Sequence, residues 1–214
     1  AVFFIHDTIQ SCFRFLSRIG FFSIGNFLQM TAQNALQALE LLKPVLRAQR
    51  WRLPILVQGQ PVQCRAQVMA LCRTLLLARD ATFSDHGLSG DVLWVGRNAP
   101  PGAWVLPVGK ANHELGREAG VVVVDLFDGL GVDTLAAVAG LVRAGGGLIL
   151  LAPPLSGWHE FDDPEYRRIT VEPPGVAGVR RHFLARMARL LAGDERVLQV
   201  DDDGAVLRLP KAAL

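Results

Sequence analysis

Short apolar segments separated by helical segments constrain the fold of this chain more than any other feature of its sequence. The clearest is "VVVVD" at residues 121–125, and similar runs occupy residues 53–58, 91–96 and 148–152. None of them alternates strictly between apolar and polar residues, which is typical of parallel strands covered on both faces. Because crossover helices supply such cover, the pattern predicts a parallel sheet within an α/β domain.

Helical spacing of apolar residues predicts the connecting helices, over residues 31–50, 62–80, 131–145 and 175–194. Pro44 lies inside the first of them and is expected to kink or split it, because proline lacks a backbone donor. A short helical turn is expected at residues 113–120. Proline-rich loops are expected at residues 97–112 and 153–177.

The last part of the chain has the pattern of a hairpin. Two short apolar runs, residues 196–200 and 205–209, flank the acidic turn "DDDG" at residues 201–204. Together these elements predict an α/β fold: an open, mainly parallel, doubly wound (Rossmann-like) sheet with helices on both faces and a C-terminal hairpin.

Composition narrows the class of protein only slightly. The 214 residues suffice for one α/β domain, and a net charge of +2 neither requires nor excludes a nucleic-acid partner. Cys12, Cys64 and Cys72 are scattered, with no CxxC pair, which argues against disulfides or a zinc site and favours a reducing, cytoplasmic location. No segment reaches the roughly 20 apolar residues that span a bilayer, so no membrane partner is expected.

Residues 1–29 differ in composition from the rest and hold seven of the eleven phenylalanines. Met30 then opens a segment that reads like an ordinary protein start. We therefore expect residues 1–29 to be an extension that is not native or is poorly ordered. The alternative is a genuine amphipathic extension that packs on a partner. The expected domain covers residues 30–210, and residues 211–214 would begin a linker.

Three glycines in "RAGGGLILLAPP" raise the question of a phosphate loop. Such a loop follows a strand and precedes a helix, so that helix amide groups and the positive end of the dipole face the anion. Residues 145–147 have the opposite order, with a predicted helix before them and a strand after them. They are therefore interpreted as the end of the helix and a tight turn into the strand.

Other short motifs fail at the residue their chemistry needs. The turn after residues 53–58 has the order of a P-loop, but Gly59 stands alone without the Lys and Ser or Thr of that motif. "HELGR" at 113–117 has Arg where a zincin helix needs His, and "DDDG" lacks the Glu of a calcium loop. The cluster "WHEFDDPE" at 158–165 is interpreted as a solvated acidic loop. We therefore predict no metal site and no catalytic residue.

One basic surface remains as a candidate site. In the predicted helix 175–194, a buried stripe is expected, formed by Val179, Phe183, Met187 and Leu190. The arginines outside it are able to contact RNA phosphates, and these are Arg180, Arg181, Arg186 and Arg189. The alternative is an ordinary solvated basic face, with Arg186 near enough to the stripe for a structural ion pair.

The order of these features resembles a known family. Residues 114–158, "ELGREAGVVVVDLFDGLGVDTLAAVAGLVRAGGGLILLAPPLSGW", are similar to the N-terminal domain of the tRNA(Met) cytidine acetyltransferase family. Residues 180–204 resemble that family's arginine-containing helix, short strand and acidic turn. The first two predicted strands and the start at Met30 also agree with it.

The resemblance implies a role in acetylating N4 of the wobble cytidine of elongator tRNA(Met), with acetyl-CoA and ATP (with Mg) as cofactors of the full-length protein. Family members join this domain to an ATPase, an acetyltransferase domain and an RNA-binding tail. This chain contains neither a Walker A motif nor an acetyl-CoA loop. The expectation is an inactive accessory domain that packs on the ATPase module and contacts tRNA. The alternative is a stand-alone Rossmann-like small-molecule or nucleotide-binding protein, with Gln58, Gly96 and Asp125 near the site.

Overall fold

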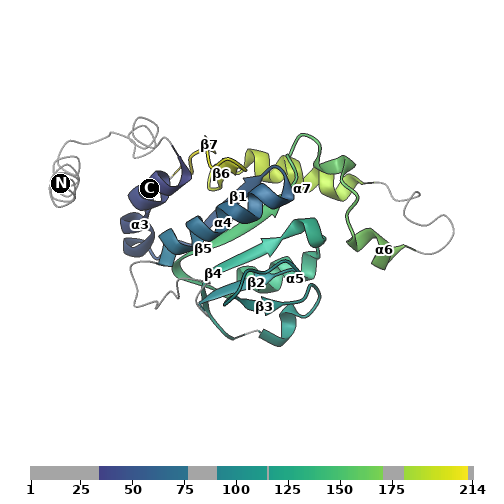
Figure 1. Ribbon diagram of the computed structural model, residues 1–214, viewed down its shortest axis with the longest axis horizontal. Coiled ribbons are helices and arrows are strands. Elements are labelled where there is room, and N and C mark those ends of the chain that lie inside the picture. The colour runs from purple at the N-terminus through teal and green to yellow at the C-terminus, as the bar shows by residue number, and fades with distance from the viewer. Residues whose placement is uncertain (1–33, 77–90, 115, 171–180, 212–214) are drawn as a thin grey trace.

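The computed structural model describes residues 34–76, 91–114, 116–170 and 181–211. Its centre is a seven-stranded sheet of order β3-β2-β4-β5-β1-β6-β7 (Figure 1). The strands are β1 (Leu53–Gln58), β2 (Val92–Val95), β3 (Trp104–Leu106), β4 (Ala119–Asp125), β5 (Val142–Ala152), β6 (Leu198–Asp201) and β7 (Val206–Arg208). All pairings are parallel except that of β6 with β7, which is antiparallel. The predicted parallel sheet and C-terminal hairpin are confirmed.

Helices cover both faces of this sheet, as the sequence predicts. The α-helices are α3 (Ala35–Ala48), α4 (Pro61–Leu76), α5 (Val132–Ala139), α6 (Glu165–Ile169) and α7 (His182–Gly193). Three short 3-10 turns complete the described elements: η1 (Ala111–Glu114), η2 (Leu126–Asp128) and η3 (Trp158–Glu160).

Two hydrophobic clusters separate the faces. Alternate strand residues such as Ile55 and Val123 pack with α3 and α4 in one cluster. Their neighbours Leu56 and Val124 pack with α5 and α7 in the other. Because successive side chains of a strand point to opposite faces, this division places α3 and α4 on one side of the sheet and α5 and α7 on the other.

Helix α3 is not split at Pro44. The helix begins at the Asn34 cap, whose side-chain oxygen accepts a hydrogen bond from the Gln37 amide at 3.0 Å, and it continues to Ala48 with the exposed Pro44 inside it. The apolar side of the helix is buried against α4 and the sheet, and this packing outweighs the lost backbone bond.

The interpretation of the glycine run as a helix end is wrong. Helix α5 ends at Ala139 with Gly140 as its cap, and Gly145–147 lie inside β5. A Cβ added at Gly146 would lie 2.1 Å from the Gly120 carbonyl oxygen of β4, beside an irregularity in the strand register. Glycine is therefore needed because the two backbones approach closely, which local helical spacing in the sequence does not reveal.

The loops hold more structure than predicted. Residues 97–112 contain the edge strand β3 and part of η1, and residues 153–177 contain η3 and α6. Strand β3 is three residues long and only its last residue is buried, so its sequence carries no clear apolar pattern. Its place is set by pairing with β2, a long-range interaction that is not visible in the local sequence.

Candidate functional site

Helix α7 positions the arginines that the sequence predicts for RNA contact. Arg180 lies outside the described residues. Arg181 precedes the first turn, and its guanidinium donates to the Glu160 carbonyl oxygen and lies 3.7 Å from the Asp162 carboxylate. Arg181 is thus held against the loop around η3, which leaves it less free for a ligand than predicted.

Arg186 and Arg189 are the two arginines that remain available. Both side chains are exposed, and because they are three residues apart they share one side of α7. No described residue forms a hydrogen bond or ion pair with either guanidinium, so the structural ion pair considered for Arg186 has no partner in the part of the chain that the structure describes.

The predicted buried stripe of α7 is wrong for Phe183 and Leu190, whereas Met187 is half-buried against the core as predicted. Val179 lies outside the described residues, Phe183 is 37% exposed and Leu190 is 55% exposed, whereas Leu184 and Ala188 are buried. The helix is rotated by about one residue from the predicted orientation, so that its small and branched side chains fit against the sheet. Its outer side therefore combines two arginines that are unpaired among the described residues with an aromatic and an aliphatic side chain.

The carboxyl edge of the parallel strands was the alternative site, and its polar groups bind one another. At the end of β4, the fully buried Asp125 carboxylate accepts from Arg65 Nε at 2.7 Å and from the Phe127 amide at 3.2 Å. Burial raises the pKa of Asp125, and the Arg65 guanidinium opposes that rise. The Arg65 guanidinium also lies over the Phe127 ring, 5.8 Å from its centroid.

At the neighbouring end of β2, the polar groups also bind one another rather than remaining available to a ligand. Asp128 accepts hydrogen bonds from the Arg97 amide at 2.6 Å and from its guanidinium at 3.2 Å. Gly96 follows β2 with φ +142, and a Cβ there would lie 2.9 Å from both Asp125 Cβ and Asp128 Oδ2. The three residues therefore leave little room for a ligand at this point of the edge.

The turn between β1 and α4 carries an anion supplied by the chain itself. The Gln60 amide donates to Asp202 Oδ2 at 2.7 Å, and a Cβ on Gly59 would lie 2.2 Å from the Asp202 carboxyl carbon. Gln58 Oε1 accepts from the Leu155 amide at 3.0 Å. The Asp202 carboxylate thus occupies the position at the amino end of α4 that a phosphate would take in a nucleotide-binding protein.

Sequence reasoning missed this role of the acidic turn. It predicted the hairpin turn correctly, since Asp201 accepts hydrogen bonds from the amides of Asp203 and Ala205 and stabilises the turn locally. The contact of Asp202 with Gln60 joins residues 142 positions apart.

Cys64, in the first turns of α4, is also unsuited to chemistry. Its side chain is fully buried, and burial, with the nearby Asp202 and Asp125 carboxylates, raises the pKa of the thiol to about 12. The thiol therefore stays protonated at neutral pH, whereas a nucleophilic cysteine needs a lowered pKa.

The acidic loop at residues 158–165 is partly structural. Asp163 is 2% exposed and accepts from the Leu130 amide at 3.2 Å and the Glu165 amide at 2.8 Å, so it is not the solvated carboxylate that we expected. His159, Glu160 and Asp162 are exposed. Within the described ranges, no group of three or more His, Cys, Asp and Glu side chains has the arrangement of a metal site.

Comparison with known proteins identifies relatives for most of the chain. The family model described as "tRNA(Met) cytidine acetyltransferase TmcA, N-terminal" matches residues 30–202. A relative from Nitrosococcus halophilus, named tRNA(Met) cytidine acetyltransferase TmcA, is 38% identical over 122 residues. Relatives of the same name from Citrobacter koseri and Haloarcula marismortui are 33% identical over 144 residues and 36% identical over 94 residues.

The aligned part is a small share of each relative. In the order given, the alignments cover 57%, 67% and 44% of this chain but 16%, 19% and 12% of the relatives, so the chain spans less than a fifth of their length. Among the described helices, none is both long enough and apolar enough to cross a membrane. From the match over residues 30–202, the chain belongs to the family of N-terminal domains of tRNA(Met) cytidine acetyltransferase TmcA.

Proposed function

We propose that this chain is an accessory N-terminal domain of an enzyme that acetylates N4 of the wobble cytidine of elongator tRNA(Met), using acetyl-CoA and ATP. In this proposal the domain has no catalytic residue, packs on the ATPase module and contacts the tRNA. The observation that carries it is the family match over residues 30–202. The packing partner comes from the family resemblance.

The non-catalytic role is supported by the carboxyl edge of the sheet. In open α/β sheets, ligands bind at this edge, where polar groups at strand ends remain available to them. Here Asp125 is paired with Arg65, Asp128 with Arg97, and Asp202 with the amide of Gln60. A nucleotide phosphate at the amino end of α4 would have to displace the Asp202 carboxylate. The same contacts weigh against the alternative of a stand-alone nucleotide-binding protein.

The tRNA contact is supported by the outer side of α7. Arg186 and Arg189 are exposed and unpaired among the described residues, and a guanidinium binds phosphate oxygens in a bidentate geometry. Phe183, 37% exposed on the same helix, adds a ring on which an unpaired base is able to stack.

Binding of this chain to tRNA at several salt concentrations tests the RNA contact. Each lost phosphate contact lowers the slope of log affinity against log salt by about 1. We therefore expect the double variant Arg186→Ala/Arg189→Ala to bind more weakly and to show a slope smaller by about 2. A matched control is Arg167→Ala/Arg168→Ala, which removes the same charge from arginines that pair with Asp162 and Glu165.

Two results would contradict the proposal. The proposed RNA contact would be refuted if tRNA binding did not depend on salt, or if the α7 variant changed binding no more than the control variant does. The proposed non-catalytic role would be refuted if this chain alone formed N4-acetylcytidine when mixed with tRNA, acetyl-CoA and ATP.

A further inference from the structure

A second basic site lies at the opposite edge of the sheet, where the strands β4 and β5 begin. It is a pocket of ≈ 570 Å³ between the end of α3, the end of α4 and the first residues of β5. Among the described residues, its charged lining consists of Arg47, Arg50, Arg143 and Asp91. Helix α3 packs on the sheet face opposite to α7, so this pocket is separate from the arginines discussed above.

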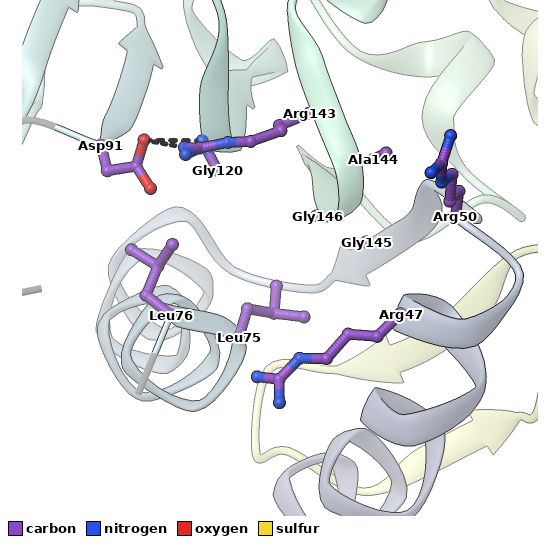
Figure 2. A pocket seen from close by; sticks show the side chains of 10 residues that line it. All are labelled: Arg47, Arg50, Leu75, Leu76, Asp91, Gly120, Arg143, Ala144, Gly145 and Gly146. Carbon is purple, nitrogen blue, oxygen red and sulfur yellow. Dashed lines mark hydrogen bonds and ion pairs between the residues drawn. The ribbon is translucent and has the colours of Figure 1, made fainter. Parts of the chain in front are cut away.

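The pocket has an excess of positive charge. Arg143 donates to the Asp91 carboxylate, and Figure 2 shows its side chain reaching across the strand starts to that residue. The Arg47 side chain extends from the end of α3 toward Leu75 (Figure 2). Arg50 lies on the side of the pocket away from Asp91 in the same view. Both side chains are exposed, and neither guanidinium has a hydrogen-bond or ion-pair partner among the described residues. Among the lining residues that the structure describes, three guanidinium groups and one carboxylate leave a formal surplus of two positive charges.

Glycines form one wall of this pocket. Gly120, Gly145 and Gly146 line it without side chains, and a Cβ at Gly145 would lie 3.6 Å from Arg47 Cγ. The wall between the arginines is therefore backbone, which a ligand is able to approach closely. The glycine run that has the wrong order for a phosphate loop thus contributes to a basic pocket by a different geometry.

Arg50 has a left-handed backbone conformation that glycine would adopt with less strain. It has φ 52, the one positive value among described residues other than glycine. The Trp51 amide donates to the Leu46 carbonyl at 2.9 Å and the Arg50 amide donates to the Arg47 carbonyl at 3.3 Å, which is the Schellman ending of α3. Glycine adopts this left-handed conformation without strain, so the arginine side chain is carried here at a cost in stability.

We propose that this pocket binds phosphate groups of RNA, through Arg47 and Arg50 with Arg143 behind them. The inference rests on the proposed function, since it assigns the tRNA a second contact. In Figure 2 the three guanidinium groups do not converge on one point. Guanidinium groups that point to separate places suit successive phosphates of a strand better than a single small ion, and arginine recognises phosphate by paired N–H donors.

The variant Arg50→Gly distinguishes a role of Arg50 in binding tRNA from a role in stabilising the fold. It removes the guanidinium and also the left-handed strain, so the melting temperature should stay the same or rise, while affinity for tRNA should fall and the salt slope should drop by about 1. Arg47→Gln should lower the slope by a similar amount. A structural role for these arginines, as cations at the negative end of α3, would instead lower the melting temperature and leave RNA binding unchanged.

The experiment measures tRNA binding by fluorescence anisotropy for the chain, for Arg50→Gly/Arg47→Gln, for the α7 variant and for the Arg167→Ala/Arg168→Ala control. A separate arm follows the shift in melting temperature caused by inorganic phosphate. Weaker tRNA binding by the pocket variant, beyond that of the control, supports the inference. Unchanged tRNA binding overturns it, even if the pocket variant loses its response to phosphate, because the site then takes only a free anion.

The two proposals fail in different ways. If the α7 variant binds weakly and the pocket variant binds like the unmodified chain, the pocket is refuted and the proposed α7 contact stands. The reverse pattern refutes the α7 contact and supports the pocket. If the unmodified chain does not bind tRNA, both are wrong.

Discussion

The substitution Gly146→Ala is predicted to damage the sheet itself. Its Cβ would lie 2.1 Å from the Gly120 carbonyl oxygen and 2.9 Å from the Arg143 carbonyl oxygen. Reaching an ordinary contact of 3.4 Å would need a shift of 3.4 − 2.1 = 1.3 Å between backbone atoms of β4 and β5. Overpacking costs about 1–3 kcal/mol, and each weakened backbone hydrogen bond adds about 1 kcal/mol. We expect a loss of about 3 kcal/mol or more.

Neighbouring glycines provide graded controls. A Cβ at Gly147 would lie 2.8 Å from Leu75 Cδ1, the movable end of a side chain, so Gly147→Ala should cost less. A Cβ at Gly145 would make only ordinary contacts, the nearest 3.6 Å from Arg47 Cγ, but φ is +79, so Gly145→Ala should cost about 1–2 kcal/mol from left-handed strain. Gly193, the last residue of α7, has nothing within 4 Å, and alanine there should not destabilise.

Urea unfolding followed by far-UV circular dichroism measures this series. With a slope of about 2 kcal/mol per molar urea, a loss of 3 kcal/mol lowers the midpoint by about 1.5 M. The predicted order of stability is Gly193→Ala, then Gly145→Ala, then Gly146→Ala. A Gly146→Ala protein as stable as the unmodified chain, or more stable than Gly145→Ala, would refute the close approach of β4 and β5.

Three further predictions concern charged groups. Arg65→Met leaves Asp125 buried without its cation and should cost about 3–5 kcal/mol at pH 7 by urea unfolding. The pKa of Asp125 is raised by burial, so its protonated form favours folding, and stability falls as pH rises through the folded pKa. In Arg65→Met that fall should move to higher pH, so the loss should shrink on acidification. Asp202→Ala should lower stability by about 1–2 kcal/mol, because α4 loses the carboxylate at its amino end; an unchanged urea midpoint would contradict that contact. The Arg196 guanidinium, together with the Arg196 amide, lowers the pKa of Asp194 to about 2, so stability from this pair is present above the unfolded pKa of about 3.9 and is lost as pH falls toward 2. Arg196→Ala should reduce that loss in acid unfolding curves, because the contact from the backbone amide of residue 196 then remains.

The sheet could be predicted from the sequence because its strands are coherent apolar runs. Residues 53–58 and "VVVVD" have buried side chains on both faces, and this burial is what removes the polar alternation from their sequences. The hairpin was predictable because its acidic turn carries its own hydrogen bonds, made locally by Asp201.

What could not be predicted depends on contacts between distant residues. Gly146 is needed for the approach of β4, and the preceding residues have helical spacing that conceals the start of β5. Strand β3 is defined by its neighbour β2. The orientation of α7 is decided by which side chains fit the sheet, so burial was wrongly predicted for Phe183 and Leu190, although Arg186 and Arg189 were correctly expected outside the buried stripe.

The candidate sites were predictable to different degrees. The arginines of α7 lie close together in sequence, so helical spacing alone brings them to one surface. The basic pocket combines Arg47 and Arg50 from one segment with Arg143 from another, about ninety residues away, and only the folded sheet brings them together. The Asp202 contact with the Gln60 amide is of the same kind.

The central claim is that this domain contacts tRNA through arginines while containing no catalytic site. The most direct measurement is the slope of log affinity against log salt for tRNA and this chain, compared with the Arg186→Ala/Arg189→Ala variant. The account predicts strong salt dependence and a slope smaller by about 2 in the variant, with little change in the Arg167→Ala/Arg168→Ala control. Equal slopes in all three proteins would contradict it.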